Sequence, residues 1–96
     1  MTSRDILDYS KTWDQWFKME KAFNGFSNDD IAKKLDLTPS TIRKWSLGRS
    51  VYKHNIAALC WAFGCSELTE DVYEKFCTHE IVSRGRHGFR TVNSVN

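Results

Sequence analysis

The feature that most constrains the fold of this chain is the spacing of its helix start and stop signals. Thr38 and Pro39 form the clearest start, because Thr is a good N-cap and Pro suits the first helical position. Pro39 is also the one proline in the chain, so the other turns depend on Gly, Asn, Asp and Ser. Gly25, Gly48 and Gly64 stand where left-handed residues would end helices. These signals divide the chain into short segments of helical length.

The segments between these signals have the apolar spacing of amphipathic helices. Thr12 and Gln15 have the spacing of a capping box, and Ser27 is a second N-cap with Asp29 and Asp30 in the first turn. The predicted helices span residues 13–24, 28–35, 39–47 and 54–63, and a fifth begins at Ser66 or Thr69. Their inward faces are predicted to carry Trp13, Trp16, Phe17, Met19, Ala22 and Phe23, then Ile31, Ala32 and Leu35, then Ile42 and Trp45, then Ile56, Leu59, Cys60 and Phe63, and last Leu68, Val72, Tyr73 and Phe76.

The expected fold is therefore an all-α, compact bundle of about five helices, with one domain over residues 1–78. A chain of 96 residues suits a single domain. Ile6, Leu7 and Tyr9 either dock on the core or form a brief extra helix. Residues 79–96 form a basic C-terminal arm or contain a short strand, because Phe89, Thr91 and Asn93 alternate with other residue types.

Charge is unevenly distributed, although the net charge is only +2. Residues 33–54 contain six Lys or Arg and one acid, residues 64–82 contain five acids and one Lys, and residues 83–96 contain three Arg. A local basic patch attracts phosphate even when the total charge is small, whereas ordinary solvated helix faces give similar numbers. The chain has neither an apolar run of membrane-spanning length nor a secretory signal, so a cytoplasmic location is expected.

The sequence gives little sign of catalytic or metal chemistry. Three cysteines are an odd number, which argues against a disulfide framework. Cys60, Cys65, Cys77 and His79 do not have a common zinc spacing, and Cys60 falls on an inward stripe. Phosphate-binding glycine loops, paired carboxylates and nucleophile elbows are not evident. We expect neither an enzyme nor a bound cofactor, metal or small-molecule ligand.

Residues 26–49 have the pattern of a helix-turn-helix. Ala32 is small enough for two short helices to cross closely. Ile31, Leu35, Leu37, Ile42 and Trp45 are predicted to hold the pair against the core. The outer face of the second helix then carries Pro39, Ser40, Arg43, Lys44 and Leu47. A helix of this kind fits the width of the DNA major groove.

The run FSNDDIAKKLDLTPSTIRKWSLGRS, followed by IAALCWAFGC, resembles the Cro/phage-repressor type of helix-turn-helix domain. The resemblance covers residues 19–65, and the Gly48-Arg49 turn and the downstream helix are more particular to this family than the two-helix motif. Asp36 replaces the glycine that the family usually has in the turn. Ser27 and Asn28 stand where the family often has Gln, and Pro39 takes a position that often reads a base.

The resemblance implies roles for particular residues. Ser27, Asn28 and Thr38 match positions that touch phosphate or cap a helix, and Arg49 and Lys53 fall in a loop that contacts the DNA backbone. Ser40, Arg43 and Lys44 match outward positions that reach bases, and Pro39 shares that face. Solubility and capping are the alternative roles for these side chains. The tail, which lies outside the resemblance, is a separate hypothesis: Arg84, Arg86 and Arg90 would follow the DNA backbone or enter a minor groove.

The implied function is a sequence-specific transcriptional regulator that binds double-stranded DNA as a homodimer on a palindromic operator. The predicted helix 39–47 would enter the major groove. The dimer surface would involve the helix after residue 66 and the tail, through Phe76, Ile81, Val82 and Phe89. One alternative is a homeodomain-like module of the transposase or terminase type, which has three helices. Another is a protein-interaction module such as an antitoxin.

Overall fold

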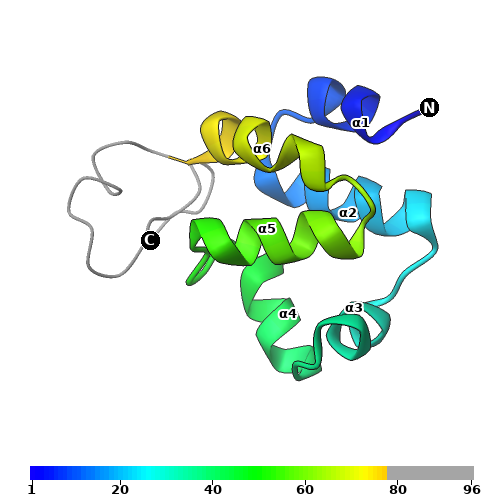
Figure 1. Cartoon of the computed structure of the whole chain (residues 1–96), viewed down its shortest axis with the longest axis vertical. Helices are drawn as coiled ribbons and strands as arrows, with labels where there is room; N and C mark the ends of the chain where they lie inside the picture. The colour runs from blue at the N-terminus through cyan, green and yellow to red at the C-terminus, as the bar shows by residue number, and fades with distance from the viewer. Residues whose placement is uncertain (78–96) are drawn as a thin grey trace.

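The computed structural model describes residues 1–77, and these residues form an all-α bundle (Figure 1). The five predicted helices are present, with bounds close to those expected, and the segment at Ile6 and Leu7 forms an additional helix before them. Ser66 and Thr69 each begin an element, because a short 3-10 helix leads directly into the last α-helix. The elements are α1 (Ser3–Tyr9), α2 (Trp13–Asn24), α3 (Asn28–Leu35), α4 (Pro39–Ser46), α5 (Lys53–Ala62), η1 (Ser66–Leu68) and α6 (Thr69–Phe76).

Side-chain caps begin α2, α3 and α4 where the sequence predicts them. The Ser27 hydroxyl accepts from the Asp30 N–H at 3.1 Å, and the Asp30 carboxylate accepts from the Ser27 N–H at 2.9 Å. This capping box lowers the pKa of Asp30, because the backbone N–H of Ser27 stabilises the charged form. Gln15 differs from the expectation by one residue: it accepts from the backbone N–H of Lys11. The cap signals therefore predict the helix start correctly, although Gln15 accepts from a donor one residue earlier than expected.

The core is built around the aromatic residues of α2. Trp13, Trp16 and Phe17 are at most 1% exposed. Trp16 and Phe17 meet Phe63 at centroid distances of 5.6 and 5.8 Å, and Phe76 lies 6.0 Å from Trp13. Edge-on contacts of this kind are favourable because the positive ring edge meets a negative ring face. Rings from α2, the end of α5 and α6 thus form one cluster.

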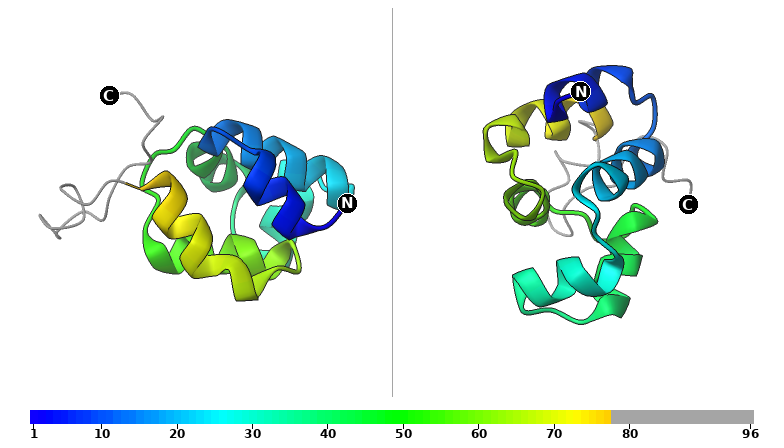
Figure 2. Two further views of the ribbon diagram at one scale, coloured as in Figure 1. Left: turned by 90° about the horizontal axis from the view of Figure 1, so that it is seen from above. Right: turned by 90° about the vertical axis from the view of Figure 1, so that its right-hand side faces the viewer.

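Helices α3 and α4 lie together at one end of the molecule, as Figure 1 and the right-hand view of Figure 2 show. Helices α1, α2, α5 and α6 make up the rest. Two residues of α3, Ile31 and Ala32, and two of α4, Ile42 and Trp45, are buried. The helix pair is therefore attached to the core by a few side chains and leaves much of its surface exposed.

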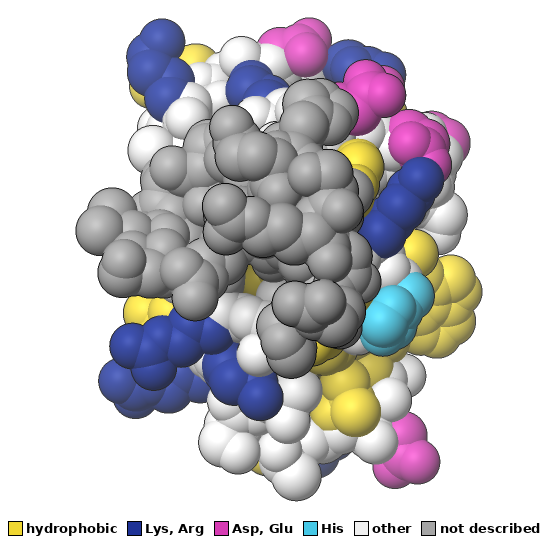
Figure 3. Space-filling view, turned by 90° about the vertical axis from the view of Figure 1, so that its left-hand side faces the viewer, with side chains coloured by type: hydrophobic (Ala, Val, Ile, Leu, Met, Phe, Trp, Pro, Cys, Tyr) yellow, Lys and Arg dark blue, Asp and Glu magenta, His cyan; other side chains and the backbone are white. Residues whose placement is uncertain are grey.

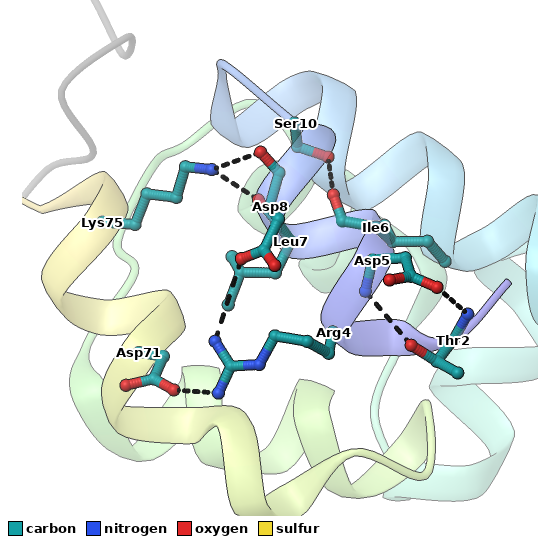
Figure 4. A network of polar contacts seen from close by, with 9 residues as sticks. All are labelled: Thr2, Arg4, Asp5, Ile6, Leu7, Asp8, Ser10, Asp71 and Lys75. Atoms are coloured by element: carbon teal, nitrogen blue, oxygen red, sulfur yellow. Dashed lines mark hydrogen bonds and ion pairs between the residues drawn. The ribbon is translucent and has the colours of Figure 1, made fainter.

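Helix α1 is held on α6 by polar contacts that connect the two ends of the described chain (Figure 4). The Arg4 guanidinium donates to the Asp71 carboxylate at 2.6 Å, which raises the pKa of Arg4. The Lys75 ammonium donates to the backbone carbonyls of Leu7 and Asp8. Since these groups are largely exposed, we attribute most of the attachment of α1 to its buried Ile6 and Leu7 side chains.

Three apolar residues that the sequence predicted to face the core are exposed instead. Ala22 and Phe23 are exposed, because the inward stripe of α2 narrows toward its end, and Leu37 is exposed in the turn. Phe76, predicted both as an inward residue of its helix and as part of a dimer surface, is fully buried. It has a place in the aromatic cluster, so it is not available to a partner. Tyr9 is also exposed and does not dock on the core.

Within residues 1–77, no helix is long and apolar enough to cross a membrane. The predicted arm or strand at 79–96 lies outside the described residues, as do Ile81, Val82 and Phe89.

Candidate nucleic-acid interface

The turn between α3 and α4 depends on a left-handed residue that is not glycine. Asp36 has φ 57° and ψ 46°, the left-handed conformation that the tight turn requires at this position. The backbone N–H of Leu37 then donates to the Ala32 carbonyl at 2.8 Å. Ala32 is 2% exposed, so its small side chain lies inside the contact that joins this helix pair to the core. Asp36 and Ala32 together allow the tight connection that the pattern predicted.

Helix α4 has one buried face and one exposed face. Ile42 and Trp45 point into the core, as predicted. All five residues expected on the outer face are exposed: Pro39, Ser40, Arg43, Lys44 and Leu47. Leu47 lies directly after the helix and is 50% exposed. The exposed face therefore combines two cations with short hydroxyl and apolar groups.

Arg43 and Lys44 form no ion pair within the part of the chain that the structure describes. Their cationic groups are therefore available to an anionic partner. Figure 3 shows that the densest group of Lys and Arg side chains on that side of the molecule lies in the lower half, at the end that α3 and α4 form. Most Asp and Glu side chains in that view lie in the upper half. On this face of the molecule, the positive charge at the α3–α4 end would attract an anionic partner.

The start of α4 carries three neighbouring hydroxyl groups. The Thr38 hydroxyl accepts from the Thr41 N–H at 3.3 Å. It also lies 3.2 Å from the Ser40 hydroxyl and 3.0 Å from that of Thr41. Thr38 is therefore the predicted cap. A hydroxyl that accepts a bond from the backbone retains its own proton to donate, so capping and contact with a phosphate are compatible.

A cation on α2 that the sequence analysis did not single out lies beside the start of α3. The Lys21 ammonium, on the last turn of α2, donates to the Asn28 side-chain carbonyl at 2.8 Å. Asp29 and Asp30 lie in the same turn of α3 and oppose the attraction of an anion by the helix N-terminus. Ser27 and Asn28 are thus placed at the predicted helix start, and their positive character comes from Lys21. Lys21 and Asn28 are seven positions apart and lie on different helices, so helical spacing did not reveal the pair.

The connection after α4 holds one of its two predicted cations in the expected place. Arg49 is exposed in the loop, where Gly48 takes φ 80° and Ser50 takes φ 54°. Lys53 instead opens α5, where its ammonium pairs with the Glu70 carboxylate and lies 5.0 Å from the centre of the Tyr73 ring. The contact with Glu70 raises the pKa of Lys53. The acidic helix α6 therefore competes with any phosphate for this lysine. Arg84, Arg86 and Arg90 lie outside the described residues.

A buried polar cluster lies away from this surface and was also missed by the sequence analysis. Glu20 is fully buried, and one of its oxygens accepts from Ser3 and Asn24 at 3.3 and 3.2 Å. The Cys65 thiol lies 3.9 Å from the other oxygen. Burial raises the pKa of Glu20 above its ordinary value, and the three hydrogen bonds reduce this effect. Ser3, Asn24 and Cys65 come from different parts of the chain, so the local spacing of α2 did not reveal this cluster.

The cysteines are buried thiols and form no disulfide with one another. A hydrogen bond with Cys65 and burial both raise the pKa of Cys60, and burial raises the pKa of Cys77 to about 12. Thiols of this kind react slowly, because the thiolate is the nucleophile. Among residues 1–77, no three His, Cys, Asp or Glu side chains are arranged to hold a metal ion. His79 lies outside these residues.

Comparison with known proteins adds no family assignment: no family model matches the chain, and no curated protein or solved structure matches it.

Proposed function

We propose that this protein is a sequence-specific transcriptional regulator that binds double-stranded DNA through α4. The observation that carries the proposal is the outward face of α4, where Arg43 and Lys44 are exposed beside Ser40 on a helix anchored by its opposite face. A helix presented in this way fits the major groove. The sequence resemblance to Cro/phage-repressor domains supports the same assignment.

In the proposed complex, Arg43 and Lys44 read bases and the flanking residues contact phosphates. Guanine presents two acceptors in the major groove, which suits an Arg or Lys donor. Thr38 and Arg49 lie just before and just after α4, so they would meet the phosphates on either side of the groove. Lys21, beside Asn28, adds a cation at the start of α3. Lys53 would contribute only if it left Glu70.

We further propose that the protein binds a palindromic operator as a homodimer. One helix-turn-helix reads only a few base pairs, and a second copy related by a two-fold axis doubles the site. Because Phe76 is buried in the core, the dimer contacts must come from other residues than this one. A cytoplasmic location is part of the same proposal.

The helices after α4 favour this proposal over a homeodomain-like module. A homeodomain-like module ends with its recognition helix as the third helix. Here α5, η1 and α6 follow α4, and Phe63 and Phe76 from this part belong to the aromatic cluster. Residues after α4 are therefore integral to the fold.

Selection of bound sequences from a random DNA pool tests the proposal directly. The expected result is a palindromic consensus whose half-sites are spaced by about one helical turn. Sedimentation of the complex gives its stoichiometry. Equal binding to every duplex would contradict the specific function, and a lack of binding even at low salt would favour the protein-interaction module.

Arg43→Ala and Lys44→Ala provide the residue-level test. Each substitution is expected to weaken binding to the selected site by ~1–3 kcal/mol if the side chain contacts a base. Lys18→Ala on α2 is the control, because Lys18 is exposed and pairs with Asp14 away from α4. Circular dichroism checks that the variants remain folded. If Arg43→Ala and Lys44→Ala unfold the chain, the assignment of the two faces of α4 is wrong.

Deletion of residues 83–96 tests the predicted role of Arg84, Arg86 and Arg90. Each lost phosphate contact reduces the salt dependence of binding, so the slope of log affinity against log salt is expected to fall. Loss of the dimer with an unchanged slope per protomer would assign the tail to pairing instead.

A further inference from the structure

The C-terminal turn of α4 is tied to the start of α2 by one long-range hydrogen bond. The Trp13 indole N–H donates to the Trp45 backbone carbonyl at 2.7 Å, across 32 positions of sequence, and the bond is buried. Within residues 1–77, the other hydrogen bonds shown for α4 are local to the helix and its flanking turns. The bond to Trp13 is thus the directional contact between α4 and the aromatic core.

Helix α4 packs mainly on α3, and few side chains attach it to the rest of the core. Helix α4 has eight residues, and only Ile42 and Trp45 are buried. Apolar burial is non-directional, so two such side chains hold the helix on the core without strictly defining its rotation and tilt. A hydrogen bond adds a preferred distance and angle. Trp13 is itself held in place, because its ring lies 5.1 Å from Trp16 and 6.0 Å from Phe76.

We propose that Trp13 is a positioning residue for DNA recognition, and that its indole N–H sets the angle at which α4 presents Arg43 and Lys44. This inference rests on the proposed DNA-binding function. Trp45 follows Lys44 directly, so a shift of the Trp45 carbonyl moves both cationic side chains. Base contacts require tight placement, whereas contacts with phosphates tolerate more movement. Loss of the bond should therefore reduce discrimination between DNA sequences more than it reduces general affinity.

Trp16, three residues after Trp13, provides a matched control. Trp16 is as deeply buried as Trp13 and belongs to the same aromatic cluster, but its indole N–H finds no hydrogen-bond partner within residues 1–77. Trp13→Phe and Trp16→Phe remove the same atoms from the same helix. Only Trp13→Phe removes a bond to α4. The comparison separates loss of positioning from loss of packing.

The experiment measures the affinity of the parent, Trp13→Phe and Trp16→Phe for the selected site and for a random duplex, at a temperature where melting curves show each protein folded. Trp13→Phe is expected to lose about tenfold on the selected site, comparable to one base contact, with a much smaller loss on the random duplex. Trp16→Phe is expected to keep the parent's ratio of the two affinities. Amide NMR shifts of α4 should change in Trp13→Phe and stay close to the parent in Trp16→Phe.

Equal losses of discrimination in the two variants, or full discrimination in Trp13→Phe, would overturn the positioning role and leave the proposed function intact. A parent protein without any preference among DNA sequences would overturn both. If a Phe variant does not fold, benzothienylalanine at the same position keeps both rings and lacks the N–H, and the same outcomes apply to it.

Discussion

The aromatic core and the helix-turn-helix are held together in different ways. Around α2, rings from three elements pack at centroid distances of 5.1–6.4 Å, and their side chains are almost wholly buried. In α3 and α4, four residues are buried, and caps and a left-handed turn residue define the geometry. Aromatic packing is concentrated in the first region, while the second leaves the outer face of α4 exposed.

This difference shows how a short chain can hold a rigid helix and still leave its outer face open. The core accepts few changes because rings are closely packed. The outer face of α4 makes no demand on packing, so substitutions there are expected to change the stability of the fold little. Substitutions in the two regions are therefore expected to differ in their effects on stability and on binding.

The largest effect is expected from Phe17→Ala. Phe17 is 1% exposed and contacts the rings of Trp13, Trp16 and Phe63, so truncation leaves a cavity. The expected loss is ~3–5 kcal/mol in the free energy of unfolding. The control is Phe23→Ala on the same helix, which should change stability by about 0.5 kcal/mol or less because Phe23 is half exposed. Urea denaturation measures both, and similar losses would contradict the assignment of the core.

A smaller loss is expected from Ala32→Leu, which fills the space at the close contact of α3. Overpacking of this kind costs typically ~1–3 kcal/mol. Ala22→Leu is the matched control, because Ala22 is exposed on α2. Denaturation together with DNA binding measures the effect. A stable Ala32→Leu variant with parental affinity would show that the position of α3 does not depend on a small residue.

The next smaller loss of stability is expected from removing the cap on α4. Thr38→Ala removes the acceptor for the Thr41 N–H and is expected to cost ~1 kcal/mol. Thr38→Ser keeps the hydroxyl and should retain most of the stability. If the two variants are equally destabilised, the methyl group of Thr38 rather than its cap is what matters.

The subtlest change is Glu20→Gln, which replaces one side-chain oxygen and removes a buried charge. Burial raises the pKa of Glu20 in the folded chain, so the folded chain favours the protonated carboxyl. The contribution of protonated Glu20 to the free energy of unfolding is therefore fully present below the ordinary Glu pKa. That contribution is lost as the pH rises through the raised folded-state pKa. Stability of the parent should therefore fall over this range, and Glu20→Gln should reduce the fall. Urea midpoints measured between about pH 4 and pH 7 test this, and parallel pH profiles would contradict it.

Much of the fold could be predicted because helix boundaries are local properties. The segments 13–24 and 28–35 have the predicted bounds, since a cap and a left-handed C-terminal residue act within one turn of the helix. The inward placement of Ile42 and Trp45 followed from their spacing, and that spacing also placed Arg43 and Lys44 on the opposite face. The candidate surface on α4 was thus predictable as a face, independent of what it binds.

The remaining features could not be predicted because they depend on residues far apart in the sequence. The engagement of Lys53 by Glu70, the burial of Glu20 among Ser3, Asn24 and Cys65, and the exposure of Leu37 all depend on how helices pack.

The amino-acid sequence by itself determined where α2, α3 and α4 begin and which face of α4 is polar, because caps and periodicity act over a few residues. Only the tertiary structure decided that Trp13 bonds to the Trp45 carbonyl while Trp16, one turn further, has no such partner within residues 1–77. The two indoles are indistinguishable by local pattern. What separates them is the position of α4 across the core, and that position exists only once the chain is packed.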